Sequence, residues 1–264
     1  MLAGPPPEPF EVPEALMRFI DVQPYELVWR NEVGGLTLRL GEPCDATYVK
    51  WMALSDGTDL TGEVERLAWA GSHTPVPEVL ESGSDEHGSW IVTRGIDAQN
   101  AVVERWRRDP FTATTALGRG LRAMHDTLDV ASCPFDWSLW RRRAEAERRF
   151  ARGYYDYHEF GWDLAGLSVS AAMRELRDAP EEDLVVCHGD ACAPNTLLDE
   201  DGNWVAHVDL GRLGVGDRWA DLSIAAWSAV WNYGPEWEQN VYEAYGYEPD
   251  LAKIRYYRLL WELG

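Results

Sequence analysis

The hydrophobic pattern of this 264-residue chain changes near residue 94. Before that point, short apolar runs rich in β-branched and aromatic residues alternate with glycine- and proline-containing turns, which is typical of strands. After it, apolar residues mostly recur at the three- and four-residue spacing of helices. Strands and helices segregated in this way predict an α+β fold with two lobes, residues 1–95 and residues 96–264.

The first lobe is predicted to contain an antiparallel sheet and one long helix. Gly34-Gly35 and the segment 41–43 separate the first three apolar runs, as expected of a meander. The expected strands are 27–29, 36–40, 46–51, 79–81 and 90–93, with a polar turn over 82–89, and the expected helices are 13–20 and 59–70.

The second lobe is predicted to be helical except for one short strand and one hairpin. Asp201-Gly202 signals the hairpin, because this dipeptide favours a tight turn between antiparallel strands. The density of Arg and Glu in 140–150 predicts an exposed helix of mixed charge. The expected strands are 184–187, 196–198 and 204–208, and the expected helices are 112–128, 140–150, 169–177, 219–231, 236–245 and 251–263.

Charge and lysine content exclude several classes of protein. The net charge of −21 argues against nucleic-acid binding, which needs basic patches. The chain has only two lysines, Lys50 and Lys253, and neither follows a glycine, so the P-loop class is excluded. The sequence shows neither a secretory signal nor an apolar run of membrane-spanning length. We therefore expect a cytoplasmic protein that binds neither membranes nor nucleic acids.

One constellation in the second lobe points to chemistry. His188-Gly-Asp190 is followed four residues later by Asn195, and the predicted hairpin then leads to Asp209-Leu-Gly211. The strand and the hairpin would bring these polar side chains to one edge. Two acids and an amide oxygen suit hard divalent cations. The spacing also matches the kinase pattern of His-x-Asp-x₄-Asn followed by Asp-x-Gly.

Phosphoryl transfer assigns a role to each residue of this constellation. Asp190 would orient the acceptor hydroxyl and accept its proton, while Asn195 and Asp209 would hold Mg²⁺ on the nucleotide phosphates. Any one of the three, taken alone, is more often a cap or a turn residue. All three in order on a strand, loop and hairpin favour a kinase-type site. His188 is expected to brace the loop without a chemical role.

A kinase site also requires a strand lysine paired with a helical glutamate. Lys50 lies at the end of the third predicted strand, in a chain that otherwise uses arginine, which suggests that a compact ammonium group is needed there. The alternative is a solvent-facing strand lysine. Glu63 and Glu65 compete as its partner, and they cannot share one helix face.

Two further segments of the first lobe are candidates for nucleotide binding. Gly34-Gly35 lies between the first two predicted strands, where a kinase covers the phosphates, although a plain hairpin turn explains it equally well. Thr93-Arg94-Gly95-Ile96 follows the last strand of the lobe, and its backbone groups are expected to hold the adenine.

These stretches together resemble the aminoglycoside phosphotransferase family, most closely its 3′-phosphotransferases, from about residue 28 to the end of the chain. The strongest match is Val186-Cys-His-Gly-Asp-Ala-Cys-Ala-Pro-Asn195 with Val208-Asp-Leu-Gly-Arg-Leu-Gly-Val-Gly-Asp-Arg218. The other matches are 121–125 with Cys133-Pro-Phe-Asp136, and 63–69 with 75–79.

The resemblance implies a protein-kinase-like fold and an antibiotic-resistance kinase that uses MgATP or MgGTP. It implies that Asp190 is the base and that Asn195 and Asp209 are metal ligands. It also favours Glu63 as the partner of Lys50, because the family glutamate lies six residues before a helix tryptophan, here Trp69. Arg212 resembles the family arginine near the reacting phosphate.

The acceptor-binding residues depart from those of the family. Relatives hold polycationic aminoglycosides with carboxylates, and at the C-terminus only Glu262 matches. Trp231 and Trp261 are expected either to stack on sugar faces or to be core residues. The further candidates are acids that either bind amines or form a solvated acidic loop, and they are Asp156, Glu159 and Asp163.

Three functions remain open on these residues. The first is phosphorylation of an aminoglycoside hydroxyl, at the 3′ position. The second is a kinase of the same fold for another amino sugar, an amino alcohol or a different antibiotic. The third is a non-catalytic nucleotide-binding module, against which the complete set of kinase residues argues. The expected partners are a nucleoside triphosphate and a small cationic sugar-like substrate, and the expected state is a monomer or weak dimer.

Overall fold

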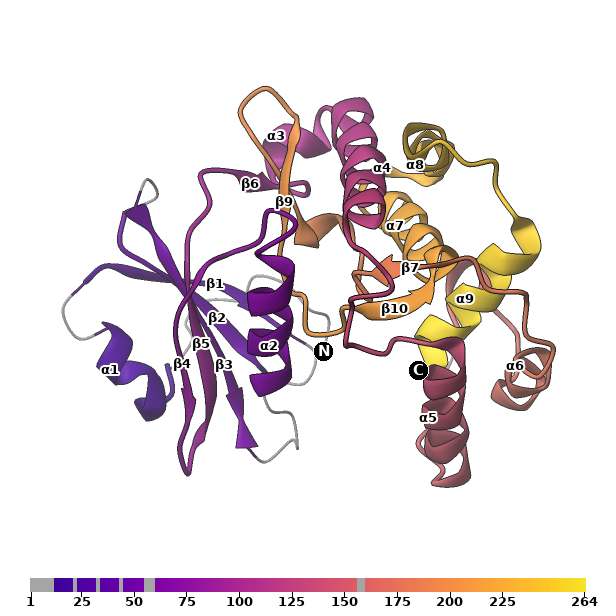
Figure 1. Cartoon of the computed structure of the whole chain (residues 1–264), viewed down its shortest axis with the longest axis horizontal. Coiled ribbons are helices and arrows are strands. Elements are labelled where there is room, and N and C mark those ends of the chain that lie inside the picture. Colours follow the sequence, from indigo (N-terminus) through magenta and orange to yellow (C-terminus); the bar gives the residue numbers. More distant parts are fainter. Residues whose placement is uncertain (1–11, 21–22, 32–33, 43–44, 55–59, 156–159) are drawn as a thin grey trace. The chain divides into compact units, whose positions relative to one another are not determined.

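The computed structural model describes residues 12–20, 23–31, 34–42, 45–54, 60–155 and 160–264 (Figure 1). The chain divides into two compact units, Met1–Ala98 and Gln99–Gly264. The first unit holds a five-stranded sheet, and the second is mainly helical. The predicted α+β fold class is confirmed.

The sheet of the first unit is antiparallel throughout and has the strand order β1-β2-β3-β5-β4. Leu36, Leu38 and Leu40 alternate along β2 and are buried, because every second residue of a strand faces the same side. The described elements are η1 (Glu14–Leu16), α1 (Met17–Ile20), β1 (Tyr25–Arg30), β2 (Leu36–Leu40), β3 (Thr47–Ala53), α2 (Thr61–Ala70), β4 (Val79–Ser84) and β5 (Gly88–Arg94).

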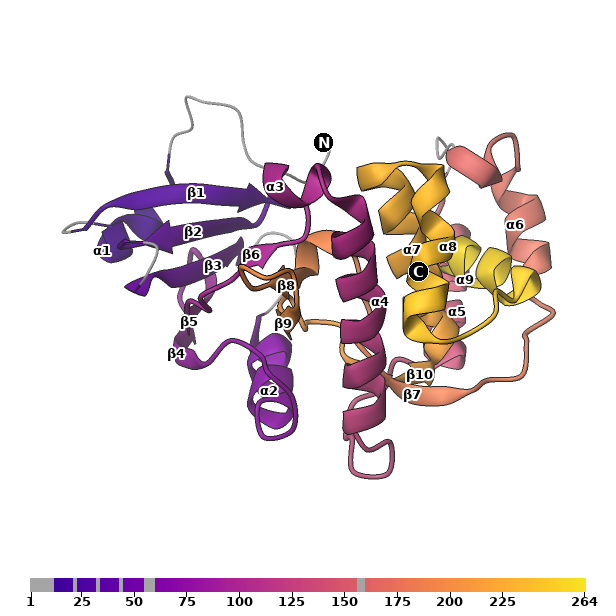
Figure 2. The same ribbon diagram turned by 90° about the horizontal axis from the view of Figure 1, so that it is seen from above.

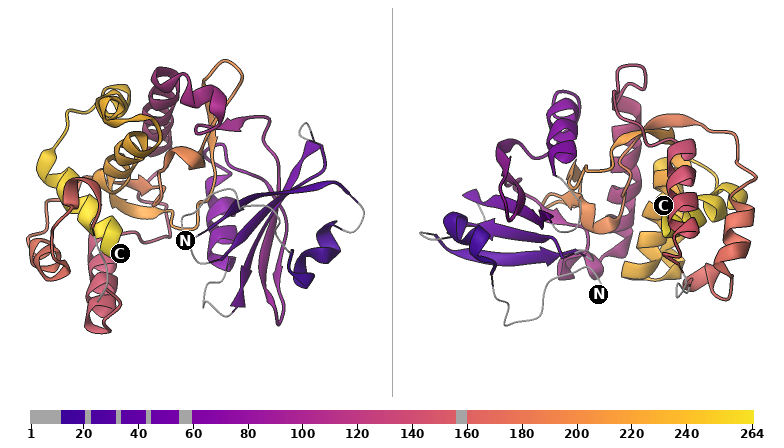
Figure 3. Two further views of the ribbon diagram at one scale, coloured as in Figure 1. Left: turned by 180° about the vertical axis from the view of Figure 1, so that it is seen from behind. Right: turned by 90° about the horizontal axis from the view of Figure 1, so that it is seen from below.

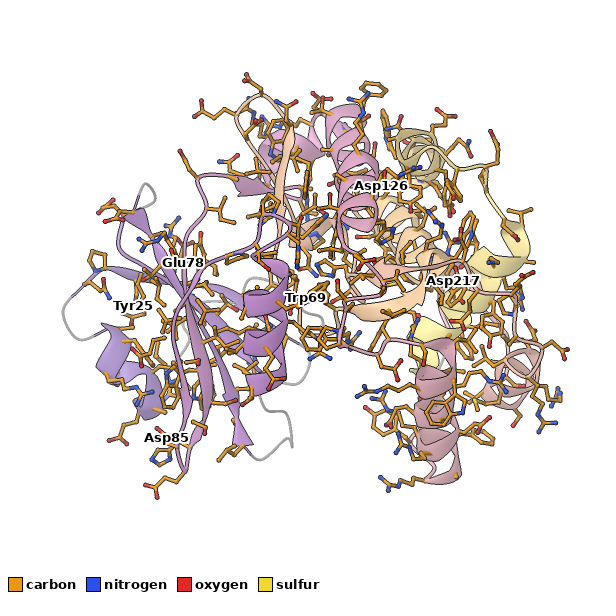
Figure 4. All side chains as sticks on the ribbon, in the orientation of Figure 1. Tyr25, Trp69, Glu78, Asp85, Asp126 and Asp217 are labelled. Carbon is orange, nitrogen blue, oxygen red and sulfur yellow. The ribbon has the colours of Figure 1, made fainter. Side chains whose placement is uncertain are left out.

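The polar turn predicted over 82–89 is much shorter in the structure. β4 continues to Ser84 and β5 begins at Gly88. Asp85, labelled at the tip of this hairpin in Figure 4, accepts the backbone N–H groups of His87 and Gly88 at 2.9 and 3.1 Å. The N–H of Asp85 also donates to the carbonyl oxygen of Gly88 at 2.9 Å, so Asp85 closes a tight turn and the flanking polar residues pair as strand.

The second unit contains most of the helices (Figure 2). α4 packs against α7 and α8, and α7 packs against α9. The elements are β6 (Gln99–Asn100), α3 (Glu104–Arg107), α4 (Pro110–Thr127), α5 (Leu139–Ala151), η4 (Trp162–Leu164), α6 (Val169–Glu175), β7 (Leu184–Cys187), η5 (Ala193–Asn195), β8 (Thr196–Leu198), β9 (Trp204–His207), β10 (Gly214–Asp217), α7 (Arg218–Tyr233), η6 (Pro235–Trp237), α8 (Glu238–Tyr245) and α9 (Leu251–Leu263).

Short elements of the second unit escaped prediction, and β10 matters most for the site. Its sequence, Gly-Val-Gly-Asp, has too little apolar content to signal a strand. It pairs antiparallel with β7, placing Gly214 opposite Cys187 (Figure 3 gives two further views of the whole chain). The pairing brings the segment before β10 back to the end of β7. β6 and α3 were also missed, since they are only two and four residues long.

α5 is not simply the exposed helix that its charges predicted. Leu139, Arg142 and Ala146 recur at helical spacing and are buried, with Arg142 only 4% exposed. The guanidinium of Arg142 lies 4.8 Å from the centre of the Trp137 ring. Burial lowers the pKa of Arg142 to about 10. The aliphatic part of the Arg142 side chain and its guanidinium, which lies over the Trp137 ring, therefore pack in the core although the residue is charged.

The core of the second unit is rich in aromatic residues, with Trp227, Tyr242, Tyr245 and Tyr257 among its largest fully buried side chains. Within the described residues, no helix is both long enough and apolar enough to span a membrane.

Candidate active site

A loop from His188 to Asn195 carries the predicted base, and β7 positions it. β7 is buried at Val185, Val186 and Cys187, and the chain then turns at Gly189, which has a φ of +85°. A Cβ atom on Gly189 would lie 2.5 Å from the Cβ of Arg212, so only glycine allows the two segments to approach so closely. The half-buried Asp190 follows directly.

Val208 joins this loop to the segment that bears Asp209. Its N–H donates to the carbonyl oxygen of Asn195 at 3.0 Å, and its carbonyl oxygen accepts from Nε2 of His188 at 2.9 Å. The other ring nitrogen of His188, Nδ1, accepts the backbone N–H of Asp190 at 3.2 Å. His188 therefore braces the loop with its proton on Nε2.

The loop 188–195 and the segment around Asp209 thus form one hydrogen-bonded frame. This frame carries Asp190, Asn195 and Asp209. Nδ2 of Asn195 donates to the carbonyl oxygen of Asp190 at 2.9 Å, so Oδ1 is the atom of this amide that could bind a metal ion. Asp209 is exposed and has a φ of +64°. Such a conformation is uncommon for a residue with a side chain, and it is a frequent feature of functional sites.

The donor set fits a magnesium ion. An amide oxygen and a carboxylate oxygen are hard ligands, and Mg²⁺ is typically bound through one or two protein ligands together with phosphates and water. Among the described residues, no cluster of three His, Cys, Asp or Glu side chains offers a metal site made by the protein alone. The pair Asn195 and Asp209 therefore suits a metal that arrives with a phosphate ligand.

Asp221, on α7, is the main site residue that the sequence analysis missed. It is fully buried, and its carboxylate accepts the backbone N–H groups of His188 at 2.5 Å and Gly189 at 2.8 Å. Nε2 of His125 lies 3.1 Å from the same carboxylate. Burial alone would raise the pKa of Asp221, but the hydrogen bond and charge of His125, with these donors, hold it below its usual value. An acid inside the apolar run 219–229 was the available signal.

His207 is a second buried histidine of this frame. Its ring centre lies 5.5 Å from that of His188, and burial, aided by His188, lowers the pKa of His207 to about 3. The unfolded chain binds this proton near pH 6.5, whereas the folded chain does not. Above pH 6.5, His207 therefore does not lower the free energy of unfolding. As the pH falls from 6.5 towards 3, His207 lowers it progressively.

We predict that the stability of the wild-type protein falls more steeply with acid than that of His207→Gln. Between pH 7.5 and pH 5.5, His207 should remove about 1.4 kcal/mol of unfolding free energy that the variant does not lose. Urea denaturation of both proteins at the two pH values measures this difference. Parallel losses in the two proteins would show that His207 is not the group responsible.

The first unit holds the predicted lysine and its partner. Nζ of Lys50, on β3, lies 2.7 Å from Oε2 of Glu63, on α2. Glu63 is buried, whereas Glu65 is exposed, so the choice between the two glutamates that the sequence left open falls to Glu63.

The glycine segments of the first unit have clear structural roles. Gly34 has a φ of +90°, and the N–H of Gly35 donates to the side chain of Asn31 at 2.6 Å, which closes the connection between β1 and β2. The N–H of Gly95 donates to the carbonyl oxygen of Ala46 at 2.8 Å, and a Cβ on Gly95 would lie 2.7 Å from that oxygen. Thr93 is half-buried at the end of β5, and Ile96 follows on the segment that leaves the sheet.

The predicted acceptor residues are only partly brought together. Trp231 and Trp261 have ring centres 5.7 Å apart and pack on the core beside Trp227. The carboxylate of Asp163 makes an ion pair with Arg258 at 2.8 Å. Glu262 is half-buried, and it follows Trp261 on α9. The remaining two candidates, Asp156 and Glu159, lie outside the described residues.

Comparison with known proteins identifies relatives over most of the chain. Residues 55–257 match the model of the phosphotransferase enzyme family. An aminoglycoside 3′-phosphotransferase of Streptomyces fradiae is 40% identical over 212 residues, which cover 76% of this chain and 78% of the relative. A streptomycin 3″-kinase of Streptomyces griseus is 34% identical over 81% of this chain and 83% of the relative. The crystal structure of an aminoglycoside 3′-phosphotransferase of type VIII matches with a TM-score of 0.81 at 32% identity, covering 95% and 97% of the two chains.

Proposed function

Given that this chain belongs to the phosphotransferase enzyme family, we propose that it transfers the γ-phosphoryl group of ATP or GTP to an aminoglycoside, at the 3′-hydroxyl. One observation carries the proposal: the backbone of Val208 ties the loop bearing Asp190 and Asn195 to the segment bearing Asp209. A base and two oxygen ligands held on one frame are what phosphoryl transfer requires, since positioning and charge neutralisation supply most of the catalysis.

Asp190 is the base in this proposal. The acceptor hydroxyl oxygen bonds to the γ-phosphorus while its proton passes to the Asp190 carboxylate. The bond from that phosphorus to the β–γ bridging oxygen breaks, and the nucleoside diphosphate leaves. Arg212, exposed and packed across Gly189, is proposed to offset negative charge on the transferred group.

Asn195 and Asp209 would hold the Mg²⁺ that accompanies the nucleotide. When bound, the ion would neutralise charge on the phosphates. The side chains serve this role by presenting oxygen atoms from a frame that His188 and Val208 already hold rigid.

The first unit is proposed to bind the nucleotide. Lys50, oriented by Glu63, would contact the phosphates. Gly34 and Gly35 would allow the β1–β2 connection to approach them, and the backbone of Thr93, Gly95 and Ile96 would hold the purine. The second unit, residues 99–264, would then supply the catalytic and acceptor-binding groups.

We predict that Lys50→Met lowers kcat/KM for the nucleotide about 10–100-fold, because a charge-assisted contact to phosphate is lost. Steady-state kinetics with varied ATP measures the effect. Lys253→Met is the matched control, since Lys253 is the other lysine and pairs with Asp217 at 2.9 Å. It should alter stability but leave kcat/KM for the nucleotide within twofold. Equal kinetic losses in both variants would contradict the assigned role of Lys50.

The acceptor is proposed to be held by a mixture of aromatic faces and carboxylates. Trp231 and Trp261 would stack on sugar rings, and Glu262, Asp156 and Glu159 would receive amines. The carboxylate of Asp163 is already paired with Arg258. We therefore propose that Asp163 shapes the wall of the acceptor site and does not bind an amine directly.

That engagement favours a second candidate, a kinase of the same fold acting on a less cationic amino sugar or another antibiotic. The ion pair engages one of the candidate acceptor carboxylates, and the two candidate tryptophans, Trp231 and Trp261, offer aromatic faces in place of charge. The similarity to a streptomycin 3″-kinase supports testing acceptors phosphorylated at other positions.

A coupled ADP-release assay tests the proposed function. Purified enzyme with MgATP or MgGTP is tested against aminoglycosides with and without a 3′-hydroxyl, then against amino sugars and streptomycin. We expect diphosphate release only with an acceptor, and no reaction with 3′-deoxy aminoglycosides. Turnover confined to other amino sugars or to streptomycin would favour the second candidate. Nucleotide binding without turnover on any acceptor would overturn both and indicate a non-catalytic module.

A further inference from the structure

The carboxylate of Asp190 is held by a group that the proposed mechanism does not use. Sγ of Cys192 lies 3.1 Å from Oδ1 of Asp190 and donates to it. The two residues are joined a second time through the backbone, because the N–H of Cys192 donates to the carbonyl oxygen of Asp190 at 2.8 Å. This tight turn holds the Cys192 backbone close to Asp190, which places the thiol within reach of the carboxylate.

A serine on α7 supports the thiol from behind. Ser228 is buried, and it lies near enough to Cys192 to work against the rise in the thiol pKa that burial and Asp190 cause. Its Oγ also accepts the backbone N–H of Ala193 at 2.9 Å and Nδ2 of Asn232 at 3.2 Å. With two donors already on its oxygen, the serine hydroxyl still has its own hydrogen to donate, and the sulfur of Cys192 is a neighbour that can accept it. The polarity of the chain is thus Ser228 to Cys192 to Asp190, and each donor polarises the next.

The thiol remains protonated under ordinary conditions, as a donor must. Burial first of all, and then the negative charge of Asp190, raises the pKa of Cys192 well above its usual value. The thiol is therefore poorly suited to act as a nucleophile, which requires a thiolate. A protonated, half-buried S–H next to a carboxylate is suited to orient it.

We propose that Cys192 and Ser228 form a hydrogen-bond relay from α7 that fixes the rotamer of the Asp190 carboxylate. The relay occupies Oδ1 and leaves Oδ2 to receive the proton of the acceptor hydroxyl. Cys192 is therefore a positioning residue for the phosphoryl-transfer step. The inference rests on the proposed function, because it assumes that Asp190 is the base.

The test compares Cys192→Ala, Cys192→Ser and Ser228→Ala in steady-state kinetics with MgATP and the best acceptor. We expect Cys192→Ala to lower kcat about tenfold while KM for both substrates changes less than twofold, since binding is intact and only the base is misoriented. Cys192→Ser keeps a donor of similar reach and should recover kcat to within threefold of wild type. The kcat of Ser228→Ala should lie between those of the two Cys192 variants, because the thiol remains but no longer has the serine hydroxyl beside it.

Cys133→Ala is the matched control, because Cys133 is also half-buried and its thiol donates to a backbone carbonyl oxygen, that of Phe135, at 3.7 Å. It should leave kcat within twofold. An unchanged kcat in Cys192→Ala would overturn the relay. So would equal losses in the Ala and Ser variants, because these would indicate a packing role for sulfur rather than donation. If Asp190→Asn keeps its activity, the proposed base itself is wrong, so the two failures are distinguishable.

Discussion

Asp190→Asn is expected to lower kcat by about 10²–10⁴-fold, the usual contribution of a general base. Asparagine has nearly the shape of aspartate and keeps an oxygen that can accept from Cys192. It cannot take up the proton of the acceptor hydroxyl. The loss should therefore appear in kcat, with KM for the nucleotide nearly unchanged, since Asp190 is assigned no contact with it.

Initial rates of ADP release at saturating acceptor measure this effect. Asp201→Asn is the control, because Asp201 is an exposed aspartate between β8 and β9. It should retain activity within twofold of wild type. Near-full activity in Asp190→Asn would remove the basis for the mechanism, because no other side chain has been assigned that proton.

Asp221→Ala is expected to destabilise the second unit by about 3–5 kcal/mol. The substitution strands two buried backbone N–H groups, those of His188 and Gly189, and removes the acid partner of His125. Buried donors without acceptors are expensive, because water cannot reach them. At roughly 2–4 °C per kcal/mol for a unit of this size, the melting temperature should fall by about 10 °C.

Thermal unfolding followed by circular dichroism measures the shift. Asp178→Ala, which removes an exposed aspartate following α6, should change the melting temperature by less than about 2 °C. The activity remaining below the melting temperature should also be reduced, since Asp221 holds the turn that precedes Asp190. A shift as small as that of the control would show that the loop does not depend on Asp221.

Hydrophobic periodicity along the chain predicted most of the helices and strands. It failed for elements whose own residues show no such periodicity. β2 and α9 follow from periodicity alone, because alternating leucines and helical spacing are local properties. β10 was invisible, because two of its four residues are glycines and the strand exists only by pairing with β7. The buried face of α5 was misjudged, because Arg142 stacks on Trp137 instead of reaching solvent.

In the candidate site, too, some residues could be recognised from their type and spacing, whereas others could be recognised only from their contacts. Asp190, Asn195 and Asp209 could be named from spacing, since the chemistry requires those side chains in that order. Asp221 and Ser228 could not, because their importance lies in which backbone and side-chain groups they meet across α7. Of the two glutamates, the family resemblance favoured Glu63, and in the structure Glu63 is the one that is buried on α2 and pairs with Lys50.

The sequence by itself determined the fold class, the family and the identity of the groups that can do phosphoryl chemistry. These depend on residue type and on spacing along the chain. Only the tertiary structure decided which groups hold Asp190, the proposed base, in place. Hydrogen bonds such as those from Cys192 to Asp190 and from the loop to Asp221 need geometry to about an ångström, and packing of β7, β10 and α7 supplies it.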